Sequence, residues 1–218
     1  MALYFDRADA GQNLAALLRR FAGHPEVIVL ALPRGGVPVG FEVAQALGAP
    51  LDLFLVRKLG VPGHEELAMG AVAMGGIRVI NEQVVSALGI SPNAIDRVAA
   101  EETVELDRRA RTYRGDRPAP HLRDRTVILV DDGLATGATM RAAAAAVRAQ
   151  SPGYTVIAVP VAASEVCDSF ISEVDEIVCA ATPEPFQAVG LWYADFSQTT
   201  DEEVRELLGR AARMHAVG

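Results

Sequence analysis

Lysine, cysteine and long hydrophobic runs are scarce in this chain of 218 residues, and each scarcity argues against a class of protein. No run of 18 or more apolar residues occurs, so we expect no membrane-spanning helix and no membrane partner. The opening residues, MALYFDRADAGQ, lack the basic and apolar regions of a secretory signal. These features predict a protein of the cytoplasm.

The two cysteines and four histidines are too scattered to indicate a metal site. Cys167 and Cys179 stand alone in the sequence and match neither a zinc pattern nor a disulfide framework, so we expect two buried thiols. The histidines show no ligand spacing either; they are His24, His64, His121 and His215.

Positive charge is almost entirely arginine, and it is unevenly distributed. The net charge of −8 argues against nucleic acid as a partner, because such binding depends on neutralising phosphates. Arginines nevertheless crowd one segment, which is either a solvated helix face followed by a loop or a mobile loop that supplies cations to a polyanionic substrate. They are Arg108, Arg109, Arg111, Arg114, Arg117, Arg123 and Arg125.

The most informative segment is 127–140, VILVDDGLATGATM. Its first four residues form a continuous apolar run, which is typical of a strand buried on both faces of a sheet. Asp131 and Asp132 follow at the carboxyl end of that strand, where open α/β sheets bind ligands. The next turn leads into an Ala-rich helix, and a helix start with small, hydroxyl-bearing residues suits a phosphate. The segment thus offers carboxylates for hydroxyls or a metal beside a cradle for a phosphate, which matches a ribose 5-phosphate.

This segment resembles the signature of the type I phosphoribosyltransferases, enzymes that use phosphoribosyl pyrophosphate (PRPP). The signature is an apolar run, two acids, three variable residues and Thr-Gly-x-Thr. The resemblance implies that Asp131 and Asp132 bind the ribose hydroxyls and that the turn binds the 5-phosphate. The turn consists of Ala135, Thr136, Gly137, Ala138 and Thr139. A P-loop NTPase is excluded because the chain contains no Gly-Lys pair, and a response-regulator acid pocket would not need the ATGAT turn.

Strands and helices alternate along the chain, which predicts an α/β fold with a mainly parallel twisted sheet and helices on both faces. We expect one phosphoribosyltransferase-like domain over 1–218, with an insertion of a hairpin, helices and a mobile loop over 59–125 and a small hood over 181–200. Asp9 is expected to cap the first helix, and Thr200 the last. The expected strands are 27–32, 51–56, 127–130, 154–161 and 176–179, with the hairpin over 68–80.

A second loop, Pro33-Arg34-Gly35-Gly36, follows the first expected strand and resembles the pyrophosphate loop of the same family. Gly35 and Gly36 have no Cβ, so backbone amides can approach two phosphates closely. Arg34 can add a bidentate charged contact. In related enzymes this loop often carries a cis peptide that does not precede proline, and the matching bond is Pro33–Arg34.

Lys58 is the only lysine in the chain and ends the second expected strand. In a sequence so rich in arginine, a lysine suggests a place where a compact point charge is needed. The surrounding stretch resembles adenine phosphoribosyltransferases, which assigns Lys58 to the pyrophosphate.

The segment 186–200, FQAVGLWYADFSQTT, contains the only tryptophan and resembles the hood that family members place over the base. We assign base binding to Trp192, Tyr193, Asp195 and Phe196, because a flat aromatic ring can stack on a heterocycle. The alternative is that Trp192 and Phe196 are core packing.

Together the motifs predict a phosphoribosyltransferase that moves ribose 5-phosphate from PRPP to a ring nitrogen of a nucleobase-like heterocycle, a purine being favoured, and releases pyrophosphate. The catalytic residues would be Arg34, Lys58, Asp131 and Asp132. Mg²⁺ would bridge substrate oxygens, with Asp131 and Asp132 as its only possible protein ligands. We also expect a homo-oligomer, with a dimer favoured. The alternatives are a PRPP-sensing regulator on the same fold, or a hydrolase or phosphatase that uses the acid pair.

Overall fold

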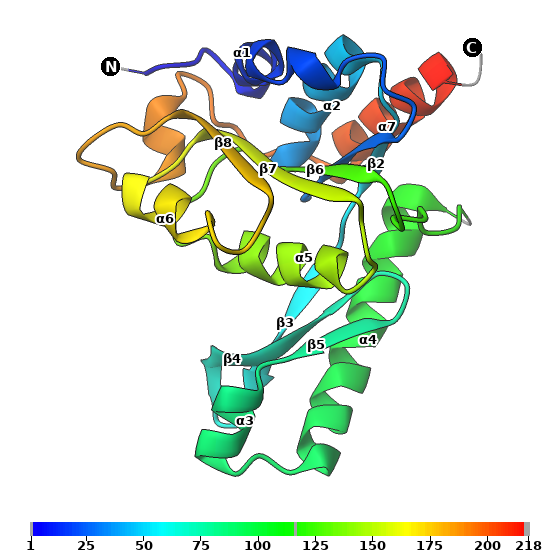
Figure 1. Ribbon diagram of the computed structural model, residues 1–218, viewed down its shortest axis with the longest axis vertical. Coiled ribbons are helices and arrows are strands. Elements are labelled where there is room, and N and C mark those ends of the chain that lie inside the picture. Colours follow the sequence, from blue (N-terminus) through cyan, green and yellow to red (C-terminus); the bar gives the residue numbers. More distant parts are fainter. Residues whose placement is uncertain (1, 116, 216–218) are drawn as a thin grey trace.

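A computed structural model describes residues 2–115 and 117–215 and divides into an upper body and a smaller lower lobe (Figure 1). The body is built on a five-stranded parallel sheet with the order β2-β1-β6-β7-β8. This confirms the expected α/β fold. The strands are β1 (Val27–Ala31), β2 (Leu51–Leu53), β6 (Thr126–Val130), β7 (Tyr154–Val161) and β8 (Glu176–Ala181).

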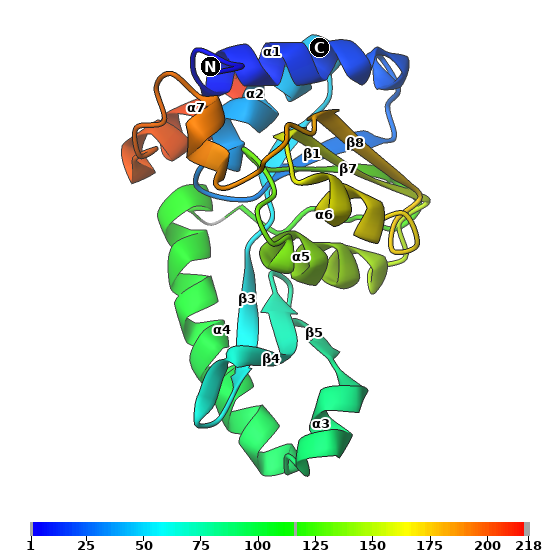
Figure 2. The same ribbon diagram turned by 90° about the vertical axis from the view of Figure 1, so that its left-hand side faces the viewer.

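Helices cover both faces of this sheet (Figures 1 and 2). Val27 and Val29 of β1 pack into the core on one face, and Ile28 packs into the core on the other. Because each face is buried, such a strand is apolar at successive positions. One face carries α1 (Arg7–Leu17), α2 (Gly36–Leu47) and α7 (Asp201–His215), and the other carries α5 (Ala138–Arg148) and α6 (Ser164–Ser169). Short 3₁₀ helices lie at Arg19–Phe21 and Val189–Trp192.

The lower lobe is a three-stranded antiparallel sheet flanked by two helices, with its own hydrophobic core. The hairpin and helices expected within 59–125 are thus present. Helix α4 runs along the side of the lobe and up to the body, so it connects the two (Figure 1). The elements are β3 (Val56–Val61), β4 (His64–Ala73), β5 (Ile77–Ile80), α3 (Glu82–Leu88) and α4 (Pro92–Arg114). Across the described residues, no helix combines the length and apolar character needed to cross a bilayer.

The expected strand over 51–56 is wrong, because this run contains parts of two strands in different sheets. Strand β2 stays beside β1 only as far as the pair Ala31 and Leu53. The chain then leaves the body, and β3 begins at Val56 in the lobe. Lys58 therefore lies within β3 and does not end a strand. Residues 53–56 are all apolar because the connecting Phe54 and Leu55 are themselves buried, so the sequence does not show the break.

The structure also corrects two local predictions, the cap of α1 and the state of the cysteines. Asp6, and not Asp9, is the cap of α1: its carboxylate accepts the Asp9 N–H at 2.8 Å, while Asp9 accepts the Phe5 N–H at 2.9 Å. Cys167 and Cys179 form a disulfide between α6 and β8 and are not free thiols. Packing of α6 onto the sheet brings them together, which the spacing alone does not reveal.

The two central strands of the sheet, β1 and β6, define a crevice at its carboxyl edge. Ala31 at the end of β1 pairs with Val130 at the end of β6. From β1 the chain continues to β2 on one side, whereas from β6 it continues to β7 on the other. The strand order therefore reverses between β1 and β6, and open α/β sheets bind ligands at such a point.

Candidate functional site

An acid pair lies at the floor of this crevice. Asp131 and Asp132 directly follow β6, and the Asp132 N–H donates to Asp131 Oδ1 at 2.9 Å. The Arg7 guanidinium, from the first residue of α1, donates through Nε to Asp132 Oδ2 at 2.8 Å. Burial raises the pKa of Asp131, and the neighbouring charge of Asp132 raises it further. Burial also raises the pKa of Asp132, but the hydrogen bond from Arg7 opposes this rise. Asp132 is therefore the more readily ionised member of the pair.

The loop after β1 packs directly against this acid pair. A Cβ added to Gly35 would lie 1.9 Å from Asp132 Oδ2, and one added to Gly36 would lie 2.7 Å from the Val130 carbonyl oxygen. Only glycine allows this approach. The peptide bond between Pro33 and Arg34 is cis, as expected.

The helices that begin beside the acid pair, α2 and α5, start without a side-chain cap, as does the shorter α6 after β7. Helices α1, α3 and α4 begin with caps from Asp6, Asn81 and Ser91. In contrast, Gly35 and Gly137 stand at the cap positions of α2 and α5, and neither offers a side-chain acceptor.

At the start of α5 the Ala138 N–H meets, within the described part of the chain, only Thr136 Oγ1, at 3.5 Å, so this end is open to another acceptor. At the start of α2 the Gly36 and Val37 N–H groups donate to the Leu32 and Arg34 carbonyl oxygens, each at 3.1 Å. The partial positive charge at a helix start favours an anion there.

The turn that leads into α5 presents the residues of the motif to the surface. Gly137 has a φ of 71°, in the left-handed region that favours glycine, and a Cβ there would lie 2.9 Å from the Phe170 ring. Ala135, Thr136, Ala138 and Thr139 are all exposed. The segment thus forms an open cradle beside the acid pair.

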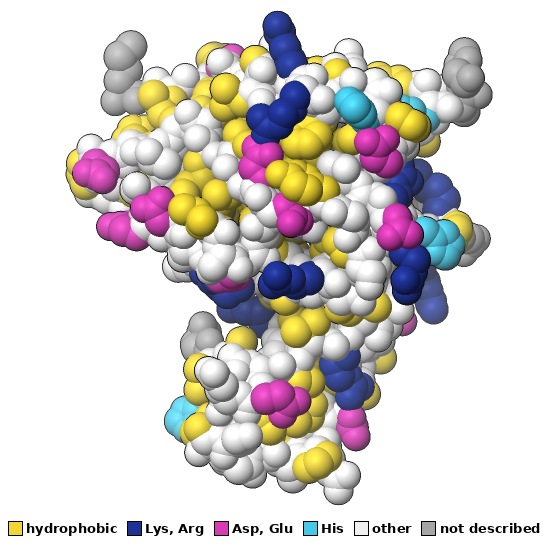
Figure 3. Space-filling view, in the orientation of Figure 1, with side chains coloured by type: hydrophobic (Ala, Val, Ile, Leu, Met, Phe, Trp, Pro, Cys, Tyr) yellow, Lys and Arg dark blue, Asp and Glu magenta, His cyan; other side chains and the backbone are white. Residues whose placement is uncertain are grey.

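A cleft lined by cations lies between this edge of the body and helix α4. It consists of two cavities, of about 290 Å³ and 840 Å³, which share Arg57, Arg109 and Thr139. Lys and Arg side chains border the narrow waist between body and lobe in Figure 3. The cations that line the two cavities are Arg34, Arg57, Lys58, Arg97, Arg108 and Arg109.

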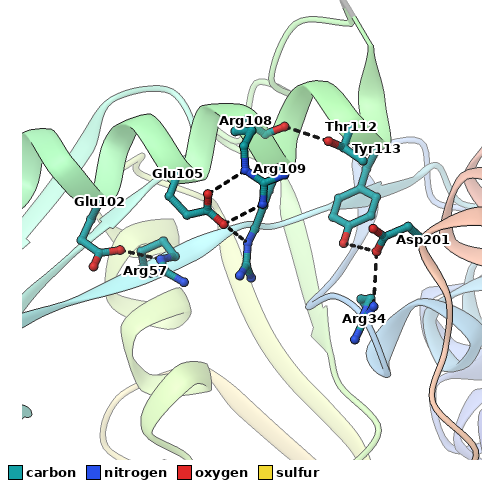
Figure 4. Close-up of polar contacts among 9 residues, drawn as sticks. All are labelled: Arg34, Arg57, Glu102, Glu105, Arg108, Arg109, Thr112, Tyr113 and Asp201. Atoms are coloured by element: carbon teal, nitrogen blue, oxygen red, sulfur yellow. Dashed lines mark hydrogen bonds and ion pairs between the residues drawn. The ribbon is translucent and has the colours of Figure 1, made fainter.

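Several of these arginines are held by carboxylates of helix α4 or α7 (Figure 4). Glu105 accepts Nε of Arg108 and Nε of Arg109, each at 2.7 Å, and these hydrogen bonds lower the pKa of Glu105 to about 2. Arg57 donates to Glu102 at 2.5 Å. Arg34 lies 3.5 Å from Asp201, which also accepts the Tyr113 hydroxyl at 2.8 Å. Carboxylates of the protein itself therefore neutralise part of the positive charge of the cleft.

Part of the arginine-rich segment lies on helix α4. Arg108, Arg109, Arg111 and Arg114 lie on α4, so the helix interpretation is correct for them and the loop interpretation is wrong. Arg114 is buried and pairs with Asp52 at 2.8 Å, which fixes α4 to β2. Only Arg108 and Arg109 of this segment line the cleft.

The hood is attached to the acid pair by Tyr193, whose hydroxyl donates to the Asp132 carbonyl oxygen at 2.6 Å. Tyr193 is buried, and burial raises the pKa of its hydroxyl. Trp192 stacks on Phe186, with ring centroids 6.3 Å apart. Phe196 is 36% exposed and lies over the Arg7 guanidinium, 3.9 Å from Cζ to the ring centroid. Asp195 is exposed on the same segment.

The sequence did not indicate Arg7 at this site, nor did it indicate the cleft residues Arg57, Arg97, Tyr113 and Asp201. An arginine in the first turn of a helix suggests a solvated side chain, and it stands 125 positions before Asp132. Sequence reasoning did bring together the two loops and the acid pair, but it placed Lys58 at the end of a strand. Lys58 is exposed in β3 and lines the larger cavity from the lobe side.

Comparison with known proteins relates this chain to a described family. A family model described as "Phosphoribosyl transferase domain" matches residues 6–179. A Mycobacterium tuberculosis protein named "Putative phosphoribosyl transferase Rv0571c" is 47% identical over 213 residues, which is 98% of this chain and 48% of that protein. The chain thus spans about half the length of the curated relatives it matches. The crystal structure of TT1426 from Thermus thermophilus is 42% identical, with a TM-score of 0.86 over 95% of this chain and 98% of that one.

Proposed function

This chain belongs to the phosphoribosyl transferase domain family, and from that premise we propose that it transfers ribose 5-phosphate from PRPP to a ring nitrogen of a heterocyclic acceptor. In this reaction the nitrogen lone pair forms a bond to ribose C1, and the bond from C1 to the pyrophosphate oxygen breaks. One observation carries the proposal. Two uncapped helix starts flank a buried acid pair at the point where the strand order reverses.

The two loops are suited to the two ends of PRPP. The turn of residues 135–139 and the first N–H groups of α5 would donate hydrogen bonds to the 5-phosphate. The loop of Gly35 and Gly36, at the start of α2, would bind the pyrophosphate, and the Gly36 N–H would then exchange its bond to the Leu32 carbonyl oxygen for one to a phosphate oxygen. Arg34 and Lys58 would add charge to the pyrophosphate from opposite sides of the cleft.

The acid pair would bind the ribose hydroxyls that lie between these ends. Asp132 is the better acceptor of the pair, because Arg7 favours its ionised form. The transition state is expected to develop positive charge on the ribose ring and negative charge on the leaving pyrophosphate. The protein therefore acts mainly by holding the partners in line and stabilising charge.

Mg²⁺ fits this site only as an ion held largely by substrate oxygens. Among the described residues no group of three or more His, Cys, Asp or Glu side chains converges. Asp131 and Asp132 provide adjacent hard oxygen ligands, and Mg²⁺ commonly takes one or two carboxylates together with phosphates and water. The ion would neutralise charge on the pyrophosphate as it leaves.

The acceptor would lie under the hood, with a purine favoured. Phe196 is the partly exposed aromatic ring of the hood, and Asp195 beside it can accept a hydrogen bond from a heterocycle. Trp192 would form the wall behind them, while the buried Tyr193 fixes the hood to Asp132. The proposal also includes a homodimer, which sedimentation of the purified chain would test.

The test is a turnover screen with PRPP, Mg²⁺ and a panel of purines and pyrimidines, with release of pyrophosphate as the readout. Release that depends on one base, is lost in Asp132→Asn and is lost with a metal chelator would support the proposal. Tight binding of PRPP without turnover of any base would favour a regulator. Failure to bind PRPP at all would overturn the proposal.

A further inference from the structure

The amino-terminal segment is built into the hood of this protein. The Leu3 and Tyr4 N–H groups donate to the Trp192 carbonyl oxygen at 2.9 and 3.0 Å. In return, the Ala194 N–H donates to the Tyr4 carbonyl oxygen at 2.9 Å, and the Asp195 N–H donates to the Phe5 carbonyl oxygen at 2.7 Å. These bonds form a short parallel bridge between Tyr4 and Tyr193. The chain then enters α1, so Arg7 is held in place by the capping of that helix.

Arg7 contacts three separate parts of the site. Its Nε donates to Asp132, and its Nη1 donates to the Ser197 carbonyl oxygen of the hood at 2.6 Å. Its guanidinium stacks under the Phe196 ring. It also borders the loop after β1, since a Cβ on Gly35 would lie 3.2 Å from Arg7 Nε. The Arg7 side chain is only 12% exposed, so these contacts are shielded from water.

A guanidinium is suited to this arrangement because its donors are fixed in one plane. One edge can bind the acid at the floor of the ribose site while another binds the hood. A lysine has one mobile ammonium on a flexible stem, so it can keep the charge near Asp132 without the planar bridge to the hood.

We propose that Arg7 is a positioning residue that couples the hood to the ribose-binding acid pair. It holds the Asp132 carboxylate in the orientation that accepts the ribose hydroxyls, and through Ser197 and Phe196 it sets the height of the hood above them. The inference rests on the proposed function, because it assigns Asp132 to PRPP. It adds a residue from the amino-terminal helix to a site otherwise built from the loops after β1, β6 and β8 and from β3 and α4 across the cleft.

A matched ion pair on the opposite edge of the sheet provides the control. Arg20 pairs with Glu176, the first residue of β8, and its guanidinium lies 4.8 Å from the Phe21 ring centroid. This pair has the same three kinds of group as Arg7, Asp132 and Phe196, at the amino edge of the strands and with a more exposed arginine, 54% against 12%. Arg20→Ala measures the loss of such a cluster where no ligand is expected.

The experiment compares wild type, Arg7→Ala, Arg7→Lys and Arg20→Ala. Calorimetry with PRPP and Mg²⁺ measures affinity, acrylamide quenching of the Trp192 fluorescence measures access to the hood, and thermal melting measures stability. Removing a charged hydrogen-bond partner should weaken PRPP binding by roughly 10–100-fold in Arg7→Ala. Arg7→Lys should recover most of the PRPP affinity, because it keeps the charge, while quenching of Trp192 rises in both Arg7 variants. Arg20→Ala should change neither affinity nor quenching.

The outcomes separate three cases. Weaker PRPP binding and greater Trp192 quenching in Arg7→Ala, with most of the PRPP affinity recovered but quenching still raised in Arg7→Lys, support the coupling. A purely structural role would lower the melting temperature of both Arg7 variants but leave affinity and quenching at wild-type values well below melting, and this would overturn the inference. If the wild type itself does not bind PRPP, the proposed function fails first; an unchanged Trp192 quenching in Arg7→Lys would then also overturn the coupling to the hood.

Discussion

Gly35 and Asp132 are in such close contact that the Cα hydrogen of Gly35 occupies the only space between them. A Cβ at Gly35 would lie 1.9 Å from Asp132 Oδ2 and 2.6 Å from Cγ. The same carboxylate oxygen accepts the Arg7 Nε. The loop after β1, the acid pair after β6 and the start of α1 therefore meet at one carboxylate, and none of the three can shift alone.

We predict that Gly35→Ala abolishes PRPP binding, because the added methyl group must push Asp132 away from Arg7. The measurement is calorimetry with PRPP and Mg²⁺, beside a thermal melt. Gly209→Ala is the matched control: a Cβ there meets only the flexible end of Arg213, at 3.5 Å. That helix substitution should stabilise the protein by roughly 0.5–1 kcal/mol and leave binding intact. Wild-type PRPP affinity in Gly35→Ala would show that this contact is not part of the site.

The two acids should respond differently to neutralisation. Folding raises the pKa of Asp131 through burial and the neighbouring charge of Asp132. The native state thus holds this proton more tightly than the unfolded chain, so the stability it contributes is present below the unfolded pKa and is lost as pH rises through the folded pKa. Near neutral pH, Asp131→Asn should gain on the order of 1 kcal/mol, or about 2–4 °C in melting temperature. The gain should vanish below about pH 4, where the carboxyl of the unfolded chain is also protonated.

Asp132→Asn should gain less stability than Asp131→Asn, because it gives up the charged hydrogen bond from Arg7. Both variants should lose PRPP affinity, since both acids are assigned to the ribose. Melting curves across the pH range, together with calorimetry, check both statements. A larger gain in Asp132→Asn than in Asp131→Asn would contradict this description of the pair.

Lys58→Ala should lower turnover far more than stability. Lys58 is exposed on β3 and faces the larger cavity, so its removal should change the free energy of unfolding by less than about 0.5 kcal/mol. Loss of a charged contact to the leaving pyrophosphate should lower turnover by roughly 10–100-fold. Lys58→Arg keeps the charge and should recover part of the rate. A variant that melts early but turns over normally per folded molecule would make Lys58 structural.

The hood should bind the acceptor and leave PRPP binding unaffected. Trp192→Ala removes the ring that stacks on Phe186 and packs against the buried Tyr4 and Tyr193, and it should raise the apparent dissociation constant of the acceptor up to about tenfold. Phe196→Ala should do the same. Phe21→Leu, in an aromatic pair with Tyr154 at the other edge of the sheet, is the control. If the acceptor found by the turnover screen leaves Trp192 fluorescence unchanged and binds Trp192→Ala normally, base selection lies elsewhere.

Local sequence patterns were enough to predict the frame of the site. The apolar run before Asp131 indicated a strand buried on both faces, and β6 is such a strand. The strand over Tyr154–Val161 and the cap of the last helix by Thr200, which accepts the Glu203 N–H at 3.1 Å, were equally readable. These features depend on neighbours within a few positions, so their signals lie in the local sequence.

The sequence by itself determined the α/β class, the acid pair and the two glycine-containing loops, because strand burial, helix starts and turns are written in local patterns. Only the tertiary structure decided that the chain leaves the parallel sheet after Leu53, that Cys167 meets Cys179 and that Arg7 binds Asp132. Each of these depends on which surfaces pack together over long separations in the chain. The sequence around Arg7, an arginine in the first turn of a helix, does not indicate which carboxylate it binds. Asp132 becomes its partner only because α1 packs over the edge of the sheet.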